Sequence, residues 1–209
     1  MAKIAFLIDG FNLCHALDYT DSSPDHFKYG KYKWLNLSKL ASLYVARLDS
    51  LSQVILFTAI ATWDPAKAAR HKLFIRANQS VGVTVVYGEF KRKERKCRVC
   101  RARYFAFEEK QTDVNIALGL FELAVKDVYD RAILVSGDTD LIPAIKAVQR
   151  TFPHKQIGTI VPIGKASESI LRTGDFSFKM RERHLASCRF PDKFELPDRS
   201  TLICPPTWK

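Results

Sequence analysis

Two aspartates, Asp138 and Asp140, stand one residue apart inside the otherwise apolar stretch 132–145. Like charges repel each other, so a pair of carboxylates between two segments suited to a protein core requires a stabilising partner. Mg²⁺ is such a partner, because it binds carboxylate oxygens together with waters and substrate phosphates. The pair therefore suggests metal-assisted chemistry, provided that the fold brings further carboxylates to the same place.

The elements that must position these acids alternate along the chain. Short apolar runs bounded by polar or turn residues predict buried strands, at 3–8, 53–60, 83–90, 132–136 and 156–162. Apolar residues at helical spacing predict helices, at 35–48, 64–80, 112–128, 140–150 and 166–173. Strands that alternate with helices imply parallel crossovers, so the sequence predicts an open α/β sheet that is mostly parallel.

This sheet would bring distant acids to one edge. Asp9 directly follows the first predicted strand and Asp138 follows the fourth, and functional groups of open parallel sheets gather at the carboxyl ends of strands. The helix that leads into the fourth strand must begin at this same edge. Asp113 lies in its first turn, on the stripe that faces the sheet. Together with Asp140, these residues aim four carboxylates at one edge.

Such a cluster has no lysine or arginine partners in its motifs, so we expect it to hold one or two Mg²⁺ ions. These ions would activate a water and stabilise the leaving oxygen of an in-line phosphoryl displacement. Asn12 and Ser136 lie beside the acids in sequence. Either side chain could orient an aspartate or a substrate phosphate, the first through its amide and the second through its hydroxyl.

Each acid also has an ordinary structural explanation. Asp138 or Asp140 alone is often a helix N-cap. Asp9 followed by Gly10 is often a turn, and Asp113 alone would favour the helix dipole. The joint placement at one edge favours the catalytic interpretation over these separate explanations.

Length and composition are those of a soluble globular protein. The chain has 209 residues, of which 47% are hydrophobic and 26% charged, which allows a substantial core. The longest uncharged apolar-rich run, 50–63, is too short for a transmembrane helix, and the first residues lack a secretory h-region. Five cysteines with one close pair form a poor disulfide framework, so we expect a reducing, cytoplasmic location.

The helical and strand patterns weaken after Asp175. We therefore expect one domain at 1–180 and a C-terminal tail at 181–209, with the Pro-rich segment 189–209 loosely packed. The stretch 18–33 is predicted to be a loop because it combines Asp, Ser, Pro and Gly.

The net charge of +11 is concentrated in one segment. Residues 91–107 carry +7, whereas 1–90 carry +3 and 108–209 carry +1. Charge that serves only solubility would be spread, so this basic insertion suggests contact with a polyanion. The basic candidates for substrate binding are Lys91, Arg92, Lys93, Arg95, Arg98, Arg101 and Arg103.

The same insertion carries the aromatic residues Tyr104, Phe105 and Phe107. Basic and aromatic side chains together suit single-stranded nucleic acid, because bases stack on the rings. The structural alternative is a solvated hairpin whose aromatics pack on the core. Contact with RNA is favoured because the segment leads directly to Asp113.

Cys97 and Cys100 form a single C-x-x-C pair within the insertion. A structural zinc ion needs four ligands, usually from a second pair. The sequence has no second close pair, and further ligands could come only through folding, from Cys188, Cys204, His15 or His184. A two-cysteine turn or a redox pair is therefore the more expected interpretation.

The stretches FLIDGFNL, EEKQTDVNIALGL and ILVSGDTDLIPAI resemble, in order and spacing, the acidic motifs of the NYN domain family. These are PIN-like ribonucleases that include LabA-like proteins, and the likeness spans roughly residues 3–180. The resemblance implies a PIN-like three-layer α/β/α sandwich with a mostly parallel central sheet. It also implies an acidic Mg²⁺ or Mn²⁺ pocket and cleavage of RNA by metal-activated water.

Carried over by this resemblance, the metal-site carboxylates would be Asp9, Asp113, Asp138 and Asp140, with Asn12 and Ser136 beside them. Asp175, in TGDFSF, resembles a recurring acid of the family, for which a structural role is the alternative to a place in the site.

We therefore expect a divalent-metal-dependent ribonuclease whose basic insertion holds the phosphate backbone, with RNA as partner, no membrane contact and homo-oligomerisation possible. The alternative is an RNA-binding or regulatory module without turnover. A nucleotide-sugar transferase also uses two aspartates spaced in this way. The chain is small for that class, however, and only the nuclease interpretation explains the basic insertion.

Overall fold

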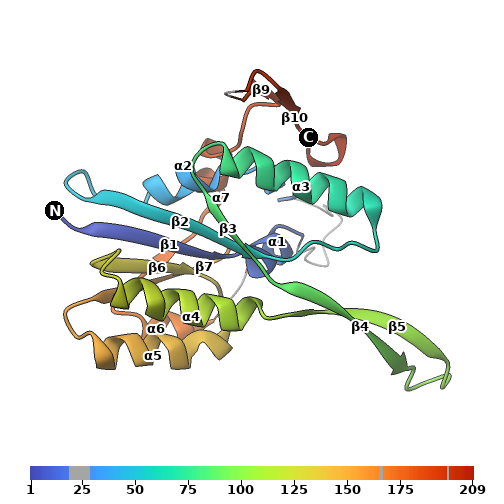
Figure 1. The fold of residues 1–209 in the computed structure, drawn as a ribbon, viewed down its shortest axis with the longest axis horizontal. Helices are drawn as coiled ribbons and strands as arrows, with labels where there is room; N and C mark the ends of the chain where they lie inside the picture. Colours follow the sequence, from blue (N-terminus) through green and yellow to red (C-terminus); the bar gives the residue numbers. More distant parts are fainter. Residues whose placement is uncertain (19–28, 165–166, 197) are drawn as a thin grey trace.

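The computed structural model describes residues 1–18, 29–164, 167–196 and 198–209. Within these ranges, a six-stranded sheet of order β3-β2-β1-β6-β7-β8 forms the centre, and all its pairings are parallel (Figure 1). The sheet strands are β1 (Lys3–Asp9), β2 (Ser50–Thr58), β3 (Thr84–Tyr87), β6 (Arg131–Val135), β7 (Gln156–Val161) and β8 (Phe176–Lys179). The helices are α1 (Gly10–Asp18), α2 (Leu37–Ser42), α3 (Pro65–Gln79), α4 (Thr112–Val125), α5 (Ile142–Thr151), α6 (Glu168–Thr173) and α7 (Glu182–Ser187).

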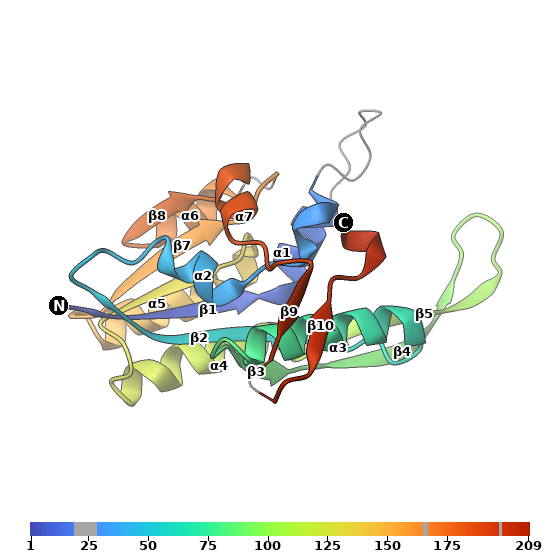
Figure 2. The same cartoon turned by 90° about the horizontal axis from the view of Figure 1, so that it is seen from above.

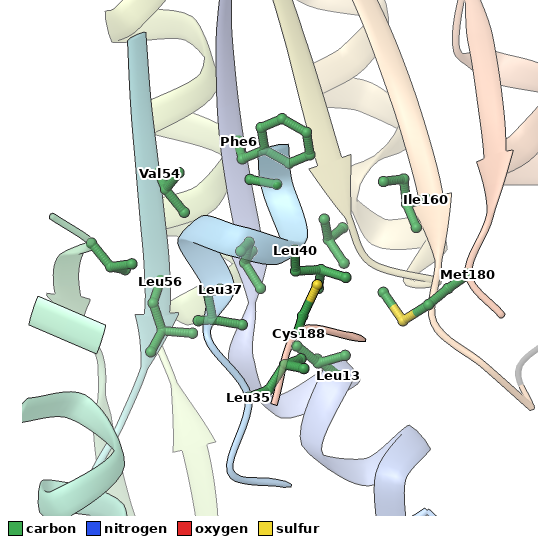
Figure 3. Packing of buried hydrophobic residues seen from close by; sticks show 14 of the residues in the cluster. Phe6, Leu13, Leu35, Leu37, Leu40, Val54, Leu56, Ile160, Met180 and Cys188 are labelled. Carbon is green, nitrogen blue, oxygen red and sulfur yellow. The ribbon is translucent and has the colours of Figure 1, made fainter. Parts of the chain in front are cut away.

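Helices cover both faces of the sheet, which completes a PIN-like α/β/α sandwich (Figure 2). Side chains of a strand alternate between faces, so Phe6 and Leu7 of β1 enter different cores. Phe6 packs with residues of α1, α2, α3 and α7, among them Leu13 and Leu40 (Figure 3). Leu7 packs with residues of α4, α5 and α6, among them Leu120. The predicted α/β fold with a mostly parallel sheet is confirmed.

The five predicted strands are all present, with a sixth, β8, that the sequence pattern did not indicate. Helix α1 was also not predicted. It begins at Gly10 directly after β1, so no separate turn segment marks its start. The predicted helix at 35–48 is shorter, and α2 begins after Asn36, whose side chain accepts the Lys39 N–H. Helix α3 begins as predicted, since Asp64 accepts the Lys67 N–H at 2.9 Å and Pro65 follows it.

The predicted loop at 18–33 lies mostly outside the described residues, but Gly30–Lys33 forms a short 3₁₀ helix. Two further 3₁₀ turns are Thr139–Leu141, which precedes α5, and Pro206–Trp208 near the C-terminus.

The basic insertion is an antiparallel hairpin of β4 (Glu89–Lys96) and β5 (Arg103–Lys110). It projects beyond the end of the sheet, and both views show its tip away from the rest of the chain (Figures 1 and 2). The structural alternative predicted for this segment was a solvated hairpin, and this alternative describes its backbone correctly.

The expectation of a loosely packed tail is wrong. Residues 189–209 contain a second hairpin, β9 (Lys193–Glu195) and β10 (Thr201–Ile203), which packs on α3 through a small core. Trp34 is fully buried in this core, and Leu202 is 2% exposed. The Pro-rich composition concealed the apolar residues between the prolines, and their burial against Trp34 is what orders the segment.

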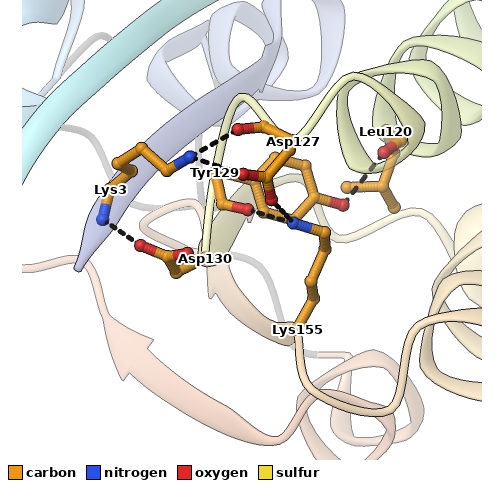
Figure 4. Close-up of polar contacts among 6 residues, drawn as sticks. All are labelled: Lys3, Leu120, Asp127, Tyr129, Asp130 and Lys155. Atoms are coloured by element: carbon orange, nitrogen blue, oxygen red, sulfur yellow. Dashed lines mark hydrogen bonds and ion pairs between the residues drawn. The ribbon is translucent and has the colours of Figure 1, made fainter.

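A network of ion pairs and hydrogen bonds lies at the amino edge of the sheet (Figure 4). The Asp130 carboxylate accepts the Lys3 N–H at 2.6 Å, and Asp127 accepts Lys3 Nζ at 2.9 Å and Lys155 Nζ at 2.6 Å. Lys155 is 4% exposed and also donates to the Tyr129 carbonyl. These lysines hold the pKa of Asp127 down at about 2.

Candidate functional site

An acidic pocket of about 220 Å³ opens at the other, carboxyl edge of the sheet, where β1 and β6 end and α4 begins. Its lining contains four acids and no lysine or arginine. The lining residues are Asp9, Phe11, Asn12, His15, Glu109, Thr112, Asp113 and Asp138.

Asp9 is the last residue of β1 and is 4% exposed. Its Oδ1 accepts the Asn12 backbone N–H at 2.9 Å and its Oδ2 accepts the Ser136 hydroxyl at 2.8 Å. Burial raises the pKa of the Asp9 carboxyl, an effect that these two hydrogen bonds oppose. Ser136 therefore orients an aspartate, which is one of its two predicted roles.

Asp138 both lines the pocket and caps the following turn. Its Oδ1 accepts the Asp140 N–H at 3.0 Å, and its own N–H donates to Ser136 Oγ at 3.1 Å. Asn12 Oδ1 accepts the Gly137 N–H at 3.0 Å, which ties α1 to the same loop. Asp140 is exposed and lies outside the pocket lining, so three of the four predicted acids line it.

Asp113 reaches the pocket from the first turn of α4. Partial loss of contact with water, followed by the charges of Asp138 and Asp9, raises the pKa of Asp113 to about 6. Glu109 and Asp140 add smaller contributions in the same direction. The predicted acids thus form one electrostatic cluster, although Asp140 stands at its margin.

Two glycines permit the close approaches on which the pocket depends. A Cβ at Gly10 would lie 2.7 Å from the Phe57 carbonyl oxygen, so glycine allows α1 to begin directly after β1. A Cβ at Gly88 would lie 2.7 Å from both the Lys110 carbonyl oxygen and Thr112 Oγ1. Gly88 therefore lets the start of β4 pass close to the start of α4.

Glu109, His15 and Thr112 line the pocket, and sequence reasoning missed all of them. The Glu109 carboxylate accepts the Thr112 N–H at 3.0 Å and also the Thr112 hydroxyl. A signal for Glu109 existed, because it lies four residues before Asp113 in the quoted acidic motif. Side chains along β5 alternate between the two faces of the hairpin. Only the register of the β4–β5 pairing determines which of these faces the Glu109 side chain lies on.

The contrast between the two edges of the sheet bears on metal binding. At the amino edge, Asp127 is paired with two lysines, whereas the lining of the acidic pocket contains no lysine or arginine. In the described part of the chain, no group of three or more His, Cys, Asp or Glu side chains is arranged to enclose a metal ion. Mg²⁺ usually takes one or two carboxylates and keeps several waters, so this donor set fits it without an all-protein cage.

Asp175, the recurring acid of the resemblance, stands apart from the pocket. Its carboxylate accepts the Ile157 N–H at 2.6 Å and the Gln149 side-chain amide at 3.2 Å. Its role in the structure is to join α5 to the start of β7.

The predicted basic residues separate onto two faces of the hairpin, because paired residues of an antiparallel ladder share a face. On one face the Glu108 carboxylate forms ion pairs with three basic side chains: Lys93 at 2.9 Å, Lys110 at 3.2 Å, and Arg95. These hydrogen bonds lower the pKa of Glu108 to about 2. Lys91 lies on the same face and pairs with Glu89 at 3.0 Å.

The opposite face carries an aromatic row that begins at the acidic pocket. Phe11 of the lining contacts Phe90, whose ring meets the edge of Trp63, with centroids 5.5 and 4.6 Å apart. Trp63 in turn stacks on Phe107, with centroids 3.8 Å apart and planes 4° from parallel. We call Phe11, Phe90, Trp63 and Phe107 the aromatic row.

Beyond the aromatic row, the same face is exposed and basic. Arg92 stacks over the Phe105 ring at 3.5 Å, and Phe105 is 56% exposed. Arg103 pairs with Glu94 at 3.2 Å. The predicted stacking surface is therefore present from Phe105 outward, whereas Phe107 packs on Trp63.

At the hairpin tip Arg98 lies between the two cysteines and Arg101 follows them, and neither arginine has an acidic partner among the described residues. The nearby backbone N–H groups of Cys100 and Val99 and the Cys100 thiol lower the pKa of Cys97. The other potential zinc ligands lie elsewhere. Cys188 is fully buried in the core that contains Phe6 (Figure 3), and Cys204 is fully buried in the small core around Trp34. His15 lines the acidic pocket, and His184 contacts Tyr44.

Comparison with known families identifies the family of the chain. The family model described as "NYN domain" matches residues 3–177. The chain belongs to the NYN domain family. The predicted resemblance is thereby confirmed, and this NYN domain is of a nuclease-like family. None of its helices in the described ranges is long and apolar enough to cross a membrane.

Two known proteins are similar to this NYN chain. One is 6-hydroxy-3-succinoylpyridine 3-monooxygenase HspA of Pseudomonas putida (strain DSM 28022 / S16), 32% identical over 120 residues. The match covers 54% of this chain but only 36% of that protein. The other is VPA0982, a protein of unknown function from Vibrio parahaemolyticus RIMD 2210633, whose crystal structure has 22% identity and a TM-score of 0.56. That match covers 87% of this chain and 94% of the other, and it supports the fold alone.

Proposed function

We propose that this protein is a divalent-metal-dependent ribonuclease that hydrolyses phosphodiester bonds of RNA. The observation that carries the proposal is the meeting of Asp9, Asp113 and Asp138 in a pocket whose lining contains no lysine or arginine. Because partial burial, followed by the neighbouring carboxylates, raises the pKa of Asp113 to about 6, the pocket favours the binding of cations, either protons or metal ions. Membership of a nuclease-like family supports the same chemistry.

Mg²⁺ or Mn²⁺ would supply Lewis acidity toward a phosphoryl oxygen and would make water a stronger nucleophile. Asp9, Asp113 and Asp138 would hold the ion through their carboxylate oxygens. Ser136 keeps Asp9 in position through its hydrogen bond, so little reorganisation is needed when the cation enters. Glu109 and Asn12 line the same cavity and would orient water or phosphate there.

The projecting hairpin would bind the RNA strand. Its salt bridges lie at the surface, where each contributes little net energy, so Lys91, Lys93 and Arg95 can exchange a carboxylate for a phosphate at small cost. Within the described ranges, Arg98 and Arg101 have no such carboxylate partner to leave. The exposed ring of Phe105 offers a stacking surface for an unpaired base.

The second candidate is an RNA-binding module of the same fold without turnover. The hairpin surface is separate from the acidic pocket, so the chain could bind RNA without cleaving it. Binding alone, however, does not explain why acids gather in a pocket whose lining has no lysine or arginine. The name of the Pseudomonas relative indicates a monooxygenase, and this chain aligns with 36% of that protein. The acidic lining favours hydrolysis of a phosphodiester over oxygenation, because it is suited to a hard cation and an anionic substrate.

The test is cleavage of labelled single-stranded and structured RNAs by the full chain, with Mg²⁺, with Mn²⁺ and with EDTA. We expect cleavage that requires the metal and falls at least about 100-fold in Asp113→Asn and in Asp138→Asn. Removal of the Asp9 or Asp140 carboxylate should also abolish cleavage while the chain stays folded. Glu122→Gln, on the exposed side of the same helix as Asp113, is the matched control and should cleave normally.

Cleavage by Asp138→Asn at the parental rate would overturn the mechanism. Binding of RNA without metal-dependent cleavage under any of these conditions would support the second candidate instead. Cleavage of single-stranded DNA at an equal rate would contradict the assignment to RNA while retaining the metal-dependent nuclease.

A further inference from the structure

We propose that Cys97 and Cys100, at the tip of the projecting hairpin, form half of a zinc site that a second copy of this chain completes. The site would hold Zn²⁺ with four cysteine sulfurs, two from each copy. This inference is independent of the proposed nuclease activity, because it concerns the opposite end of the hairpin from the acidic pocket.

The backbone at the tip already presents the two sulfurs together. The Cys97 N–H donates to the Ala102 carbonyl at 2.8 Å, and the Arg101 N–H donates to the Cys97 carbonyl at 3.1 Å. Arg101 adopts a left-handed conformation with φ of 62°, which closes the turn immediately after Cys100. The backbone N–H groups of Cys100 and Val99 and the Cys100 thiol lie near the Cys97 sulfur and lower the pKa of Cys97.

Such a turn is suited to metal binding. The backbone N–H groups directed at the Cys97 sulfur stabilise negative charge on it, as outer-shell hydrogen bonds do for the ligands of metal sites. The C-x-x-C spacing is the spacing of structural zinc sites, in which each pair supplies two of four tetrahedral ligands. The tip therefore provides half of such a site in a single turn.

The remaining ligands are not provided by the same chain in its described part, where no cluster of three or more metal-binding side chains occurs. Cys188 and Cys204 are fully buried in other cores, and His184 is engaged with Tyr44. The nearest acid on the hairpin, Glu94, pairs with Arg103. The projection of the hairpin also carries the tip away from the body of the chain (Figures 1 and 2).

A second copy is the partner that the tip fits. Two hairpins that approach tip to tip supply an identical cysteine pair each, and the projection keeps the two bodies apart. Val99, between the cysteines, is 92% exposed and would be covered by such a contact. Closed two-fold contacts of this kind use the same residues on both copies.

Charge makes this contact dependent on the metal. Each tip carries Arg98 and Arg101, which have no acidic partner in the part of the chain that the structure describes, so two bare tips repel each other. A Zn²⁺ ion with four thiolates carries a net charge of about −2, which attracts these arginines. We therefore expect zinc, and not the hairpin surface alone, to hold the two copies together.

The test uses the full chain, reduced and freed of metal, to which Zn²⁺ is added with Mg²⁺ in excess. The molar mass is measured by light scattering after size exclusion, and bound zinc is measured in the eluted peak. Zinc bound at the acidic pocket would persist in Cys97→Ser, so the cysteine-dependent zinc is the difference from that variant. We expect about 0.5 cysteine-dependent zinc per chain, a doubled mass, and reversal by a chelator.

Cys97→Ser and Cys100→Ser should each lose this zinc and remain monomeric, whereas Cys14→Ser, at an exposed cysteine of α1, should dimerise as the parent does. Co²⁺ in place of Zn²⁺ should give the intense charge-transfer absorption of tetrahedral thiolate ligation in the dimer. About one cysteine-dependent zinc per chain in a monomer would overturn the proposal, as would the absence of such zinc. A dimer that forms without zinc or survives Cys97→Ser would also overturn it.

Discussion

The Ser136 hydroxyl donates a hydrogen bond to Asp9 Oδ2 at 2.8 Å, although the two residues are 127 positions apart in the chain. Asp9 ends β1 and Ser136 follows β6, and these strands are neighbours in register, with Ile8 opposite Val135. Both residues are nearly inaccessible to water, at 4% and 0% exposure. The bond therefore orients the Asp9 carboxylate at the edge where the acidic pocket opens.

Ser136→Ala should weaken the function of the pocket without unfolding the chain. Loss of the donor leaves Asp9 Oδ2 without this partner in a buried setting, so metal affinity or cleavage should fall about 10–100-fold. Calorimetry with Mn²⁺ and the RNA cleavage rate are the measurements. Ser177→Ala, at an exposed serine of β8, is the control and should change neither quantity. Parental values in Ser136→Ala would show that the bond does not position Asp9.

Metal binding should depend on pH through Asp113. Its pKa is raised from 3.8 to about 6, so the folded metal-free chain holds this proton more tightly than the unfolded chain does. Its contribution to the free energy of unfolding therefore declines as pH rises from about 4 to about 6. Metal ions compete with the same proton, so apparent Mn²⁺ affinity should fall up to about tenfold per pH unit below pH 6.

Asp113→Asn provides the control for this pH dependence. The variant should bind Mn²⁺ more weakly at pH 7 and should show a shallower fall in affinity at lower pH. The pKa of Asp9 is raised as well, so part of the slope should remain. An unchanged slope in Asp113→Asn would assign the titration to another group.

Trp63→Ala should release the base of the hairpin from the body. Trp63 lies between β2 and α3, stacks on Phe107 and meets Phe90, so it links the body to both hairpin strands. We expect amide hydrogens of 89–110 to exchange faster, with little change in Tm because the central sheet does not include the hairpin. Unchanged exchange in 89–110 would show that other contacts hold the hairpin.

Leu202→Ala should destabilise the chain by about 2–4 kcal/mol, because it leaves a cavity in the core around Trp34. Ile203→Ala, at the next residue with 56% exposure, should cost less than about 0.5 kcal/mol. Denaturant unfolding of both variants measures the difference. Equal small effects would mean that the C-terminal hairpin contributes little to stability, as the Pro-rich composition suggested.

The order of strands and helices was predictable because local rules decide it. Apolar runs bounded by turn residues identified five of the six sheet strands, and Asp64 with Pro65 identified the start of α3. The same rules placed Asp9, Asp113 and Asp138 at the carboxyl edge, since strand direction determines which residues end there. Strand β8 was missed because its few residues carry too little pattern to separate it from a loop.

The tertiary structure alone decided which side chains act together. Glu109 faces the pocket and Glu108 faces the basic side only because β4 and β5 pair in one register, with Phe90 opposite Glu109. A shift of one residue would exchange these faces, and the sequence of a single strand carries no information on that choice. The position of each acid along the chain thus follows from the sequence, whereas its neighbours follow from strand pairing over long distances.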